Sequence, residues 1–160
     1  MLVVADTSTL IALAACEGLP YLEKLFEEVR VPGAVFQECT LPGKFKADSL
    51  ASYLLGKVIE IDMSDLVIAA AGLGNGELEA MALYKRIHAD FLLVDDYRAR
   101  VVARVNGISV VGSLGVLLRA KEVGYIAAVA PLVIDIQNAG IRYSKQLVDE
   151  ALKLAGEGGA

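Results

Sequence analysis

Five short runs of mostly apolar residues, separated by longer segments of helical character, most constrain the fold of this chain. The runs are Leu2–Val4, Val29–Val31, Val58–Ile61, Phe91–Val94 and Ile108–Val111. Strands that are apolar at nearly every position are typical of parallel sheets buried on both faces, and parallel strands need crossover connections, which are usually helices. The alternation therefore predicts an α/β fold with helices on both faces of a parallel sheet.

The segments between these runs show helical periodicity and the glycine and proline signals of helix ends. We expect helices over Ser8–Cys16, Tyr21–Glu28, Ala34–Cys39, Ala47–Leu55, Asp62–Ala71, Glu77–His88, Arg98–Val105, Leu114–Glu122, Ile126–Asn138 and Ser144–Leu154. We interpret the glycine-rich stretch Gly72–Gly76 as a loop that lets the next helix begin close to a packed neighbour.

The length of 160 residues predicts a single domain over residues 1–160. We expect its core over about residues 1–125, C-terminal helices up to about residue 155, and a frayed tail from 156 to 160. Hydrophobic residues make up 56% of the chain, yet no apolar run is as long as a membrane-spanning helix. The N-terminus also lacks the features of a signal peptide, so we expect a cytoplasmic protein without a membrane partner.

The inventory of reactive side chains narrows the possible chemistry. Cys16 and Cys39 show no metal-ligand spacing and are expected to be buried free thiols, which leaves a zinc site without ligands. The single histidine, His88, does not by itself exclude a Ser-His-Asp triad, but the chain has no G-x-S-x-G motif. The net charge of −5 counts against a non-specific nucleic-acid binder. Any chemistry is therefore expected to depend on carboxylates.

Acidic residues occur where two of the expected strands end. Asp6 ends the first strand, and Asp95 and Asp96 end the fourth. If these strands are neighbours at the switch point of the sheet, their carboxyl ends place Asp6 and Asp96 across one crevice, and Glu38 and Glu77 can join from adjacent helices. Clustered carboxylates stay ionised at neutral pH when a cation joins them, and hard oxygen ligands suit Mg²⁺ or Mn²⁺. Such ions polarise phosphodiesters and activate water.

Each of these acids also has a simpler structural interpretation. The role of Asp6 or Ser8 could be limited to capping the helix that follows. Glu38 could be a solvated helix residue. Glu77 and Glu79 are two positions apart, so only one can face the crevice, and Glu79 could reach back to the helix cap.

The neighbouring pair Asp95 and Asp96 presents the same choice. One carboxylate could point into the crevice while the other caps the helix that begins near Arg98.

Four stretches of the chain, in this order and spacing, resemble the PIN-domain family of metal-dependent ribonucleases, which includes the toxins of VapC-type toxin–antitoxin pairs. The stretches are Val3–Ser8, Val31–Glu38, Gly76–Leu83 and Ala89–Asp96. The likeness covers roughly residues 1–125. The segments Asp95–Arg100 and Gly112–Lys121 are similar to a prokaryotic subgroup of that family.

The resemblance implies a three-layer α/β/α fold whose five-stranded parallel sheet has the order 3-2-1-4-5. It implies that Asp6, Glu38, Glu77 and Asp96 form the catalytic and metal site for Mg²⁺ or Mn²⁺, that Ser8 supports it, and that Asp95 is an auxiliary metal ligand. The implied activity is endonucleolytic hydrolysis of single-stranded RNA by the toxin of a toxin–antitoxin pair.

Two departures from the family pattern support an alternative. The third family acid is commonly Asp but is Glu77 here, and Val94 stands where the family often has Thr. The alternative is therefore a catalytically weak or inactive PIN-like module that binds RNA or protein. A response-regulator receiver domain also gathers acids at strand ends, but it needs a Lys at the end of the fifth strand, where this chain has Val111-Gly112-Ser113.

Two surfaces suggest partners. Arg98 and Arg100 could hold RNA phosphates or an acidic segment of a small antitoxin protein, although an ordinary solvated helix face explains them equally simply. An apolar stripe could bury a homodimer partner, with core packing as the role of at least half of it. This stripe consists of Tyr21, Leu22, Leu25 and Phe26.

Overall fold

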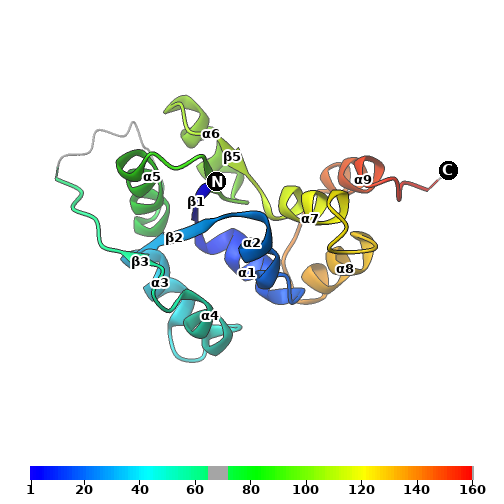
Figure 1. Cartoon of the computed structure of the whole chain (residues 1–160), viewed down its shortest axis with the longest axis horizontal. Coiled ribbons are helices and arrows are strands. Elements are labelled where there is room, and N and C mark those ends of the chain that lie inside the picture. Colours follow the sequence, from blue (N-terminus) through cyan, green and yellow to red (C-terminus); the bar gives the residue numbers. More distant parts are fainter. Residues whose placement is uncertain (65–71, 160) are drawn as a thin grey trace.

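The five expected strands form one parallel sheet in the computed structural model, which describes residues 1–64 and 72–159. The strands are β1 (Leu2–Ala5), β2 (Glu28–Pro32), β3 (Val58–Ile59), β4 (Phe91–Leu93) and β5 (Val110–Val111). Their order is β3-β2-β1-β4-β5, and every pairing is parallel. The α/β class and the strand order expected from the sequence are thus confirmed (Figure 1).

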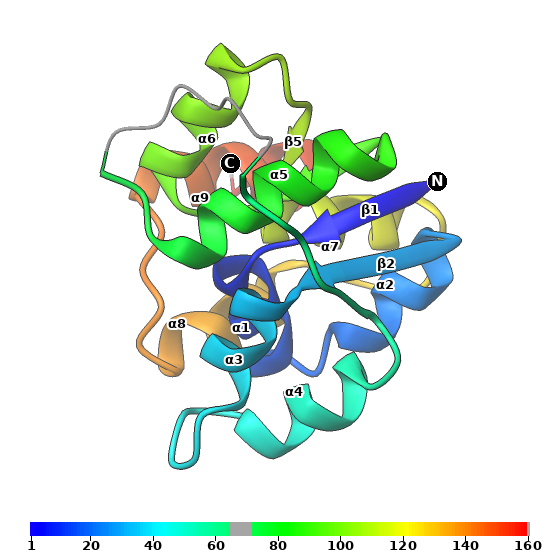
Figure 2. The same cartoon turned by 90° about the vertical axis from the view of Figure 1, so that its left-hand side faces the viewer.

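Six of the described helices connect consecutive strands as crossovers, and three follow β5. The described helices are α1 (Thr7–Ala15), α2 (Leu19–Leu25), α3 (Gly33–Thr40), α4 (Ala47–Leu54), α5 (Asn75–Ile87), α6 (Tyr97–Val105), α7 (Ser113–Glu122), α8 (Ala130–Asn138) and α9 (Lys145–Leu154). Figure 2 shows α5 running alongside β1 and β2, and it also packs on β4 and α3. The helix expected over Asp62–Ala71 falls, apart from its first three residues, outside the described residues. None of the described helices is long and apolar enough to cross a membrane.

The register of β1 against β4 places the candidate acids side by side. Val4 pairs with Leu92 and Ala5 with Leu93, and the backbone N–H of Asp6 donates to the carbonyl of Leu93 at 2.8 Å. These strands are the centre of the core, where Val3, Val4, Ala5 and Leu93 are fully buried. Because β1 and β4 are adjacent and parallel, the acids that follow them emerge at the same edge of the sheet.

The burial of side chains tests two further expectations, for the cysteines and for the apolar stripe near α2. Cys16 and Cys39 are buried free thiols, as expected. Leu22 and Phe26 belong to the core, so half of the apolar stripe on α2 is internal packing. The outer half, Tyr21 and Leu25, is only partly buried.

The C-terminal region differs from expectation at two points. Helix α8 begins at Ala130 instead of Ile126, with Pro131 in its first turn, where the missing N–H of proline costs nothing. The expected fraying of the tail is wrong for Glu157. Its carboxylate accepts hydrogen bonds from the backbone N–H groups of Val129 (2.7 Å) and Ala130 (2.9 Å) and pairs with the Lys121 ammonium at 2.8 Å.

Replacing Glu157 with Gln is expected to lower the thermal midpoint at neutral pH. Partial burial alone would raise the pKa of Glu157. The hydrogen bonds from Lys121 and from the start of α8 outweigh this effect and lower that pKa from 4.5 to about 2. A carboxyl group whose pKa falls on folding stabilises the folded state above its unfolded pKa. The advantage of the wild type should therefore be complete above about pH 5 and shrink as the pH falls toward 2.

Differential scanning fluorimetry across this pH range measures the effect. The control is Glu122→Gln, which removes a carboxylate that pairs with Arg119 on the exposed surface of α7 and is expected to change little. A Glu157→Gln difference that persists undiminished in acid would contradict the explanation.

Candidate metal centre

A pocket of about 330 Å³ lies at the carboxyl edge of the sheet, where β1 and β4 end. It is lined by Asp6, Thr7, Ser8, Glu38, Gly74, Glu77 and Asp96. The structure thus brings together the four acids and the serine that the sequence analysis selected. They lie in helices or at helix starts. Thr7 and Gly74 also line the pocket, and sequence reasoning did not name them as site residues, although Thr7 lies inside the first matching stretch.

Asp6 is the buried acid of this pocket, with only 2% of its surface exposed. One carboxylate oxygen, Oδ2, caps α1 by accepting hydrogen bonds from the Ser8 backbone N–H (3.3 Å) and the Ser8 hydroxyl (2.9 Å). The other oxygen, Oδ1, is buried and has no hydrogen-bond partner among the described residues. Burial, together with the nearby charge of Glu77, raises the pKa of Asp6 from 3.8 to about 6 against the effect of the Ser8 hydrogen bonds. The capping and crevice interpretations of Asp6 therefore both hold for one side chain.

Ser8 connects the two central strands at the pocket. Its hydroxyl donates to Asp6 and accepts the backbone N–H of Asp95 at 3.0 Å. Because one oxygen contacts both chain segments, it fixes the end of β4 relative to the end of β1.

Glu38 reaches the pocket from α3. Its carboxylate accepts hydrogen bonds from the Thr7 hydroxyl at 2.7 Å and from the backbone N–H of Gly76 at 3.2 Å. A β-carbon on Gly76 would lie only 2.5 Å from Glu38 Oε1. The glycine thus allows the start of α5 to approach the carboxylate. The close approach expected at Gly72–Gly76 is present, but Gly76 already belongs to α5 and is not part of a loop.

If the pocket holds a divalent cation, replacing Gly76 with Ala is expected to lower the activity that depends on this cation at least tenfold, without loss of thermal stability. The new methyl group displaces the Glu38 carboxylate, and a flexible glutamate can move at little cost in stability. Alanine in a helix is also favoured over glycine by about 1 kcal/mol. Cleavage rates and thermal midpoints measure the two effects.

Gly33→Ala is the matched control for this substitution. A β-carbon there would lie 2.6 Å from the carboxylate of Glu60, which does not line the pocket. Equal activity losses in both variants would contradict a special role for the position of Glu38.

Glu77 lies in the pocket, as expected from the sequence, and it also takes the capping role that was considered for Glu79. Glu77 lines the pocket and is also the residue that caps α5, because its Oε2 accepts the backbone N–H of Gly74 at 2.8 Å. The expectation that Glu79 caps its own helix is wrong. Glu79 instead accepts the backbone N–H of Ala34 at 3.0 Å and so caps the start of α3.

Asp95 and Asp96 point in different directions. Asp96 lines the pocket and caps α6 by accepting the backbone N–H of Ala99 at 2.9 Å. The carboxylate of Asp95 accepts the backbone N–H and the hydroxyl of Ser113, both at 2.6 Å, and is not among the pocket residues. Burial raises the pKa of Asp95 against these hydrogen bonds from Ser113.

The Asp95 contact extends to the C-terminal region. The hydroxyl of Ser113, which is fully buried, also contacts the Tyr143 hydroxyl at 2.5 Å. Arg100 lies beside this group and donates to the carbonyl of Val94 at 3.0 Å. Arg98 is exposed and donates to the carbonyl of Gly72 at 3.3 Å. The structure therefore separates the two arginines, one beside Asp95 and one on the surface near the pocket.

The pocket residues fit a hard divalent cation in their chemistry. The donors are carboxylate oxygens, and the unpartnered Oδ1 of Asp6 is a buried acceptor that a cation would satisfy. Across residues 1–64 and 72–159, however, no three acid, cysteine or histidine side chains are close enough to share one ion. Glu38 and Glu77 are held by Thr7, Gly76 and Gly74, so metal binding requires these flexible side chains to turn toward Asp6.

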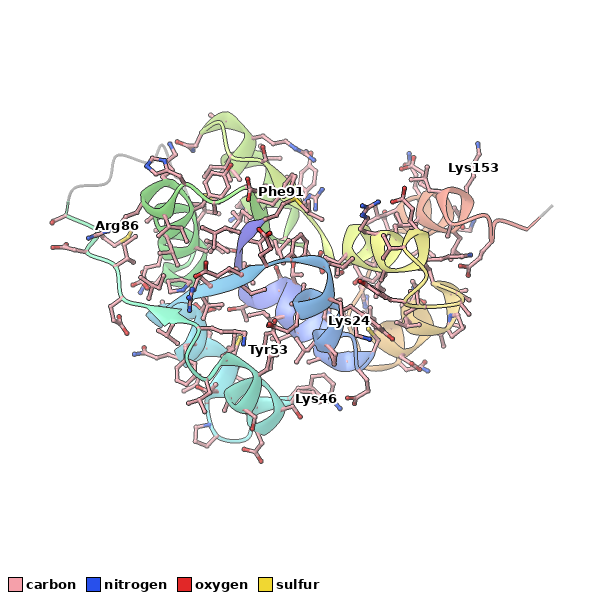
Figure 3. All side chains as sticks on the ribbon, in the orientation of Figure 1. Lys24, Lys46, Tyr53, Arg86, Phe91 and Lys153 are labelled. Atoms are coloured by element: carbon pink, nitrogen blue, oxygen red, sulfur yellow. The ribbon has the colours of Figure 1, made fainter. Side chains whose placement is uncertain are left out.

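A second, larger pocket of about 560 Å³ lies away from the acids, between α1, α2 and α4. Its lining is mostly apolar and includes Lys24 and Tyr53, which are labelled in Figure 3. The Tyr53 hydroxyl is buried near Glu23, and Lys57 lies over its ring at 4.7 Å. Sequence reasoning gave no sign of this pocket, because it forms only where α4 packs beside the consecutive helices α1 and α2.

Comparison with known families identifies the fold. Residues 2–157 match a family model described as PIN domain, and the chain belongs to the PIN-domain family. Comparisons with curated proteins and with solved structures gave no match. PIN domains are generally nucleases, which are hydrolases, and they typically use divalent metal ions.

Proposed function

We propose that this protein is a Mg²⁺- or Mn²⁺-dependent endoribonuclease that hydrolyses single-stranded RNA and leaves 5′-phosphate and 3′-hydroxyl ends. The observation that carries the proposal is the buried Oδ1 of Asp6. It has no partner among the described residues and lies in a pocket that three further carboxylates line. Burying an isolated carboxylate costs folding free energy. Such carboxylates are typical of functional sites that bind a cation or a proton.

Asp6, Glu38, Glu77 and Asp96 would hold the cation, with Asp6 as the fixed ligand. When bound, a divalent cation polarises a phosphodiester and lowers the pKa of water. Ser8 orients the Asp6 carboxylate through its hydroxyl, and Thr7 orients Glu38 in the same way. The start of α6 contributes Asp96, and this helix start also favours negative charge.

The test is cleavage of a labelled single-stranded RNA with Mn²⁺, Mg²⁺ or EDTA by the wild type and by Asp6→Asn. Metal-dependent cleavage that the substitution removes supports the proposal. Equal cleavage by both proteins would indicate a contaminating nuclease and would contradict the assignment of Asp6.

We further propose that the protein is the VapC-like toxin of a toxin–antitoxin pair, acts in the cytoplasm as a homodimer, and is restrained by a small antitoxin. The support is the likeness of Val3–Ser8, Val31–Glu38, Gly76–Leu83 and Ala89–Asp96 to such toxins. Induced expression should arrest growth with the wild type and spare it with Asp6→Asn. Normal growth with an enzyme that is active in vitro would argue against the toxin role.

A second candidate is a PIN-like module that binds RNA or protein with little or no catalysis. It is favoured by the hydrogen bonds that already occupy Glu38, Glu77 and Asp96 and by the absence of a preformed three-ligand cluster in the described part of the chain. Isothermal titration with Mn²⁺ separates the candidates. The binding module predicts no affinity at millimolar metal, and the nuclease predicts binding that Asp6→Asn removes.

A further inference from the structure

Helix α6 presents an apolar stripe to solvent. Tyr97, Val101 and Val105 follow one another at intervals of four residues, and they are 79%, 40% and 75% exposed. Residues four apart share a helix face. The opposite face packs on the core through Ala99 and Ala103, which are fully buried. The stripe therefore contributes nothing to the core of the described fold.

Arginines flank this stripe on both sides. On a helix with 3.6 residues per turn, Arg98 projects beside one edge of the stripe and Arg104 beside the other. Helix α6 contains three arginines and no acid, in a chain of net charge −5. None of the ion pairs in the described parts of the chain includes an arginine of α6. The exposed face of α6 is thus both apolar and basic. No ion pair among the described residues neutralises its charge.

The basic face begins at the acidic pocket. Asp96 lines the pocket, and Tyr97 is the next residue and the first of α6. Of the other helices that supply pocket side chains, α1 and α3 contain no lysine or arginine, and the cations of α5 lie in its last turn, at the far end from the pocket. Among the described helices that supply pocket side chains, only α6 therefore presents cations close to a polyanion that enters the pocket.

We propose that the exposed face of α6 binds the single-stranded RNA next to the cleaved bond, with a base stacked on Tyr97 and phosphates held by Arg98 and Arg104. This inference rests on the proposed nuclease function and adds the surface that holds its substrate. An exposed aromatic ring interleaved with arginines is the arrangement that binds single strands without sequence readout, because every base has a stacking face. Val101 continues the apolar surface one turn beyond the ring.

The test is fluorescence anisotropy of a fluorescein-labelled single-stranded RNA roughly 12 nucleotides long in EDTA, where cleavage does not interfere. Tyr97→Ala is expected to weaken binding about 5- to 50-fold, and Tyr97→Phe, which keeps the ring, should restore it. Tyr125→Ala, which removes another exposed tyrosine, is the control and should bind like the wild type.

Salt dependence separates the roles of the two kinds of residue. Arg98→Gln is expected to reduce the slope of log affinity against log salt by about 0.7, the value for one phosphate contact on a single strand. Tyr97→Ala should leave this slope unchanged, because stacking releases no counterions. Arg119→Gln is the matched control on α7. In cleavage assays with Mn²⁺, Tyr97→Ala should raise KM and leave kcat nearly unchanged.

The outcomes distinguish this inference from the nuclease proposal. If the wild type cleaves RNA and Tyr97→Ala binds and cleaves RNA equally well, the proposed binding surface is wrong and the nuclease function stands. If binding depends on Tyr97 but no metal supports cleavage, the surface stands and the nuclease function fails. A wild type that binds no RNA overturns both. A Tyr97→Ala protein that binds RNA normally but changes from dimer to monomer in sedimentation overturns the surface as well, and assigns it to a contact between copies.

Discussion

Replacing Asp6 with Asn is expected to abolish metal-dependent RNA cleavage and, in EDTA at neutral pH, to make the folded protein more stable. The substitution removes the proposed cation ligand, so activity should fall by at least about 100-fold. It also removes a buried negative charge whose Oδ1 has no partner in the part of the chain that the structure describes. A residue needed only for structure would show the opposite change in stability, because its loss would destabilise the fold.

The sign of the stability change follows from the pKa of Asp6. Burial raises it from 3.8 to about 6, so the folded state favours the protonated form. The stability linked to that preference is present below the unfolded pKa and is lost as the pH rises through about 6. At neutral pH the ionised carboxylate then costs up to about 3 kcal/mol, which the neutral amide avoids. The gain of the variant should therefore disappear below about pH 4.

Thermal unfolding in EDTA and in Mn²⁺ measures this balance. Mn²⁺ should raise the midpoint of the wild type, because a bound ion satisfies Asp6, and should leave Asp6→Asn unchanged. Asp135→Asn, which changes an exposed aspartate on α8, is the control. A variant that is less stable than the wild type in EDTA, or that keeps its cleavage activity, would contradict this account of Asp6.

The sheet could be predicted from the sequence because its signal is local. Each strand is a short apolar run, and the order of the strands followed from the resemblance of four motifs that lie at strand ends and helix starts. Helix boundaries such as those of α4 and α7 were predicted within one residue at each end, since glycine, proline and apolar periodicity mark them. Asp6 and Asp96 came together because parallel neighbouring strands end at one edge, and Glu38 and Glu77 join them from α3 and α5.

The choice between neighbouring acids could not be predicted, because the partners that decide it are distant in the chain. Glu79 is bound by the backbone of Ala34, and Asp95 is bound by Ser113. Glu157 likewise reaches the start of α8, whose backbone N–H groups are available only once α7 and α8 have packed. Local spacing describes which side chains could cap a helix, but tertiary packing determines which of them do.

Asp95 and Asp96 are adjacent acids, and their substitution is expected to separate stability from activity. Asp95→Ala should destabilise the fold by about 3 kcal/mol, because it leaves the buried N–H and hydroxyl of Ser113 without their acceptor. Asp96→Ala loses only a helix cap and should cost about 1 kcal/mol. Chemical denaturation of both variants measures this difference.

Asparagine substitutions at the same two positions test whether Asp95 is an auxiliary metal ligand. Asp96→Asn keeps the cap, because asparagine caps helices as well as aspartate does, but it removes the pocket charge and should reduce cleavage at least tenfold. Asp95→Asn keeps an acceptor for the Ser113 N–H and gains a donor for its hydroxyl, so stability and cleavage should both stay close to wild type. If Asp95→Asn folds normally yet loses Mn²⁺ affinity, the Asp95 carboxylate turns toward the metal when the site is filled, and the division of roles between the two acids is wrong.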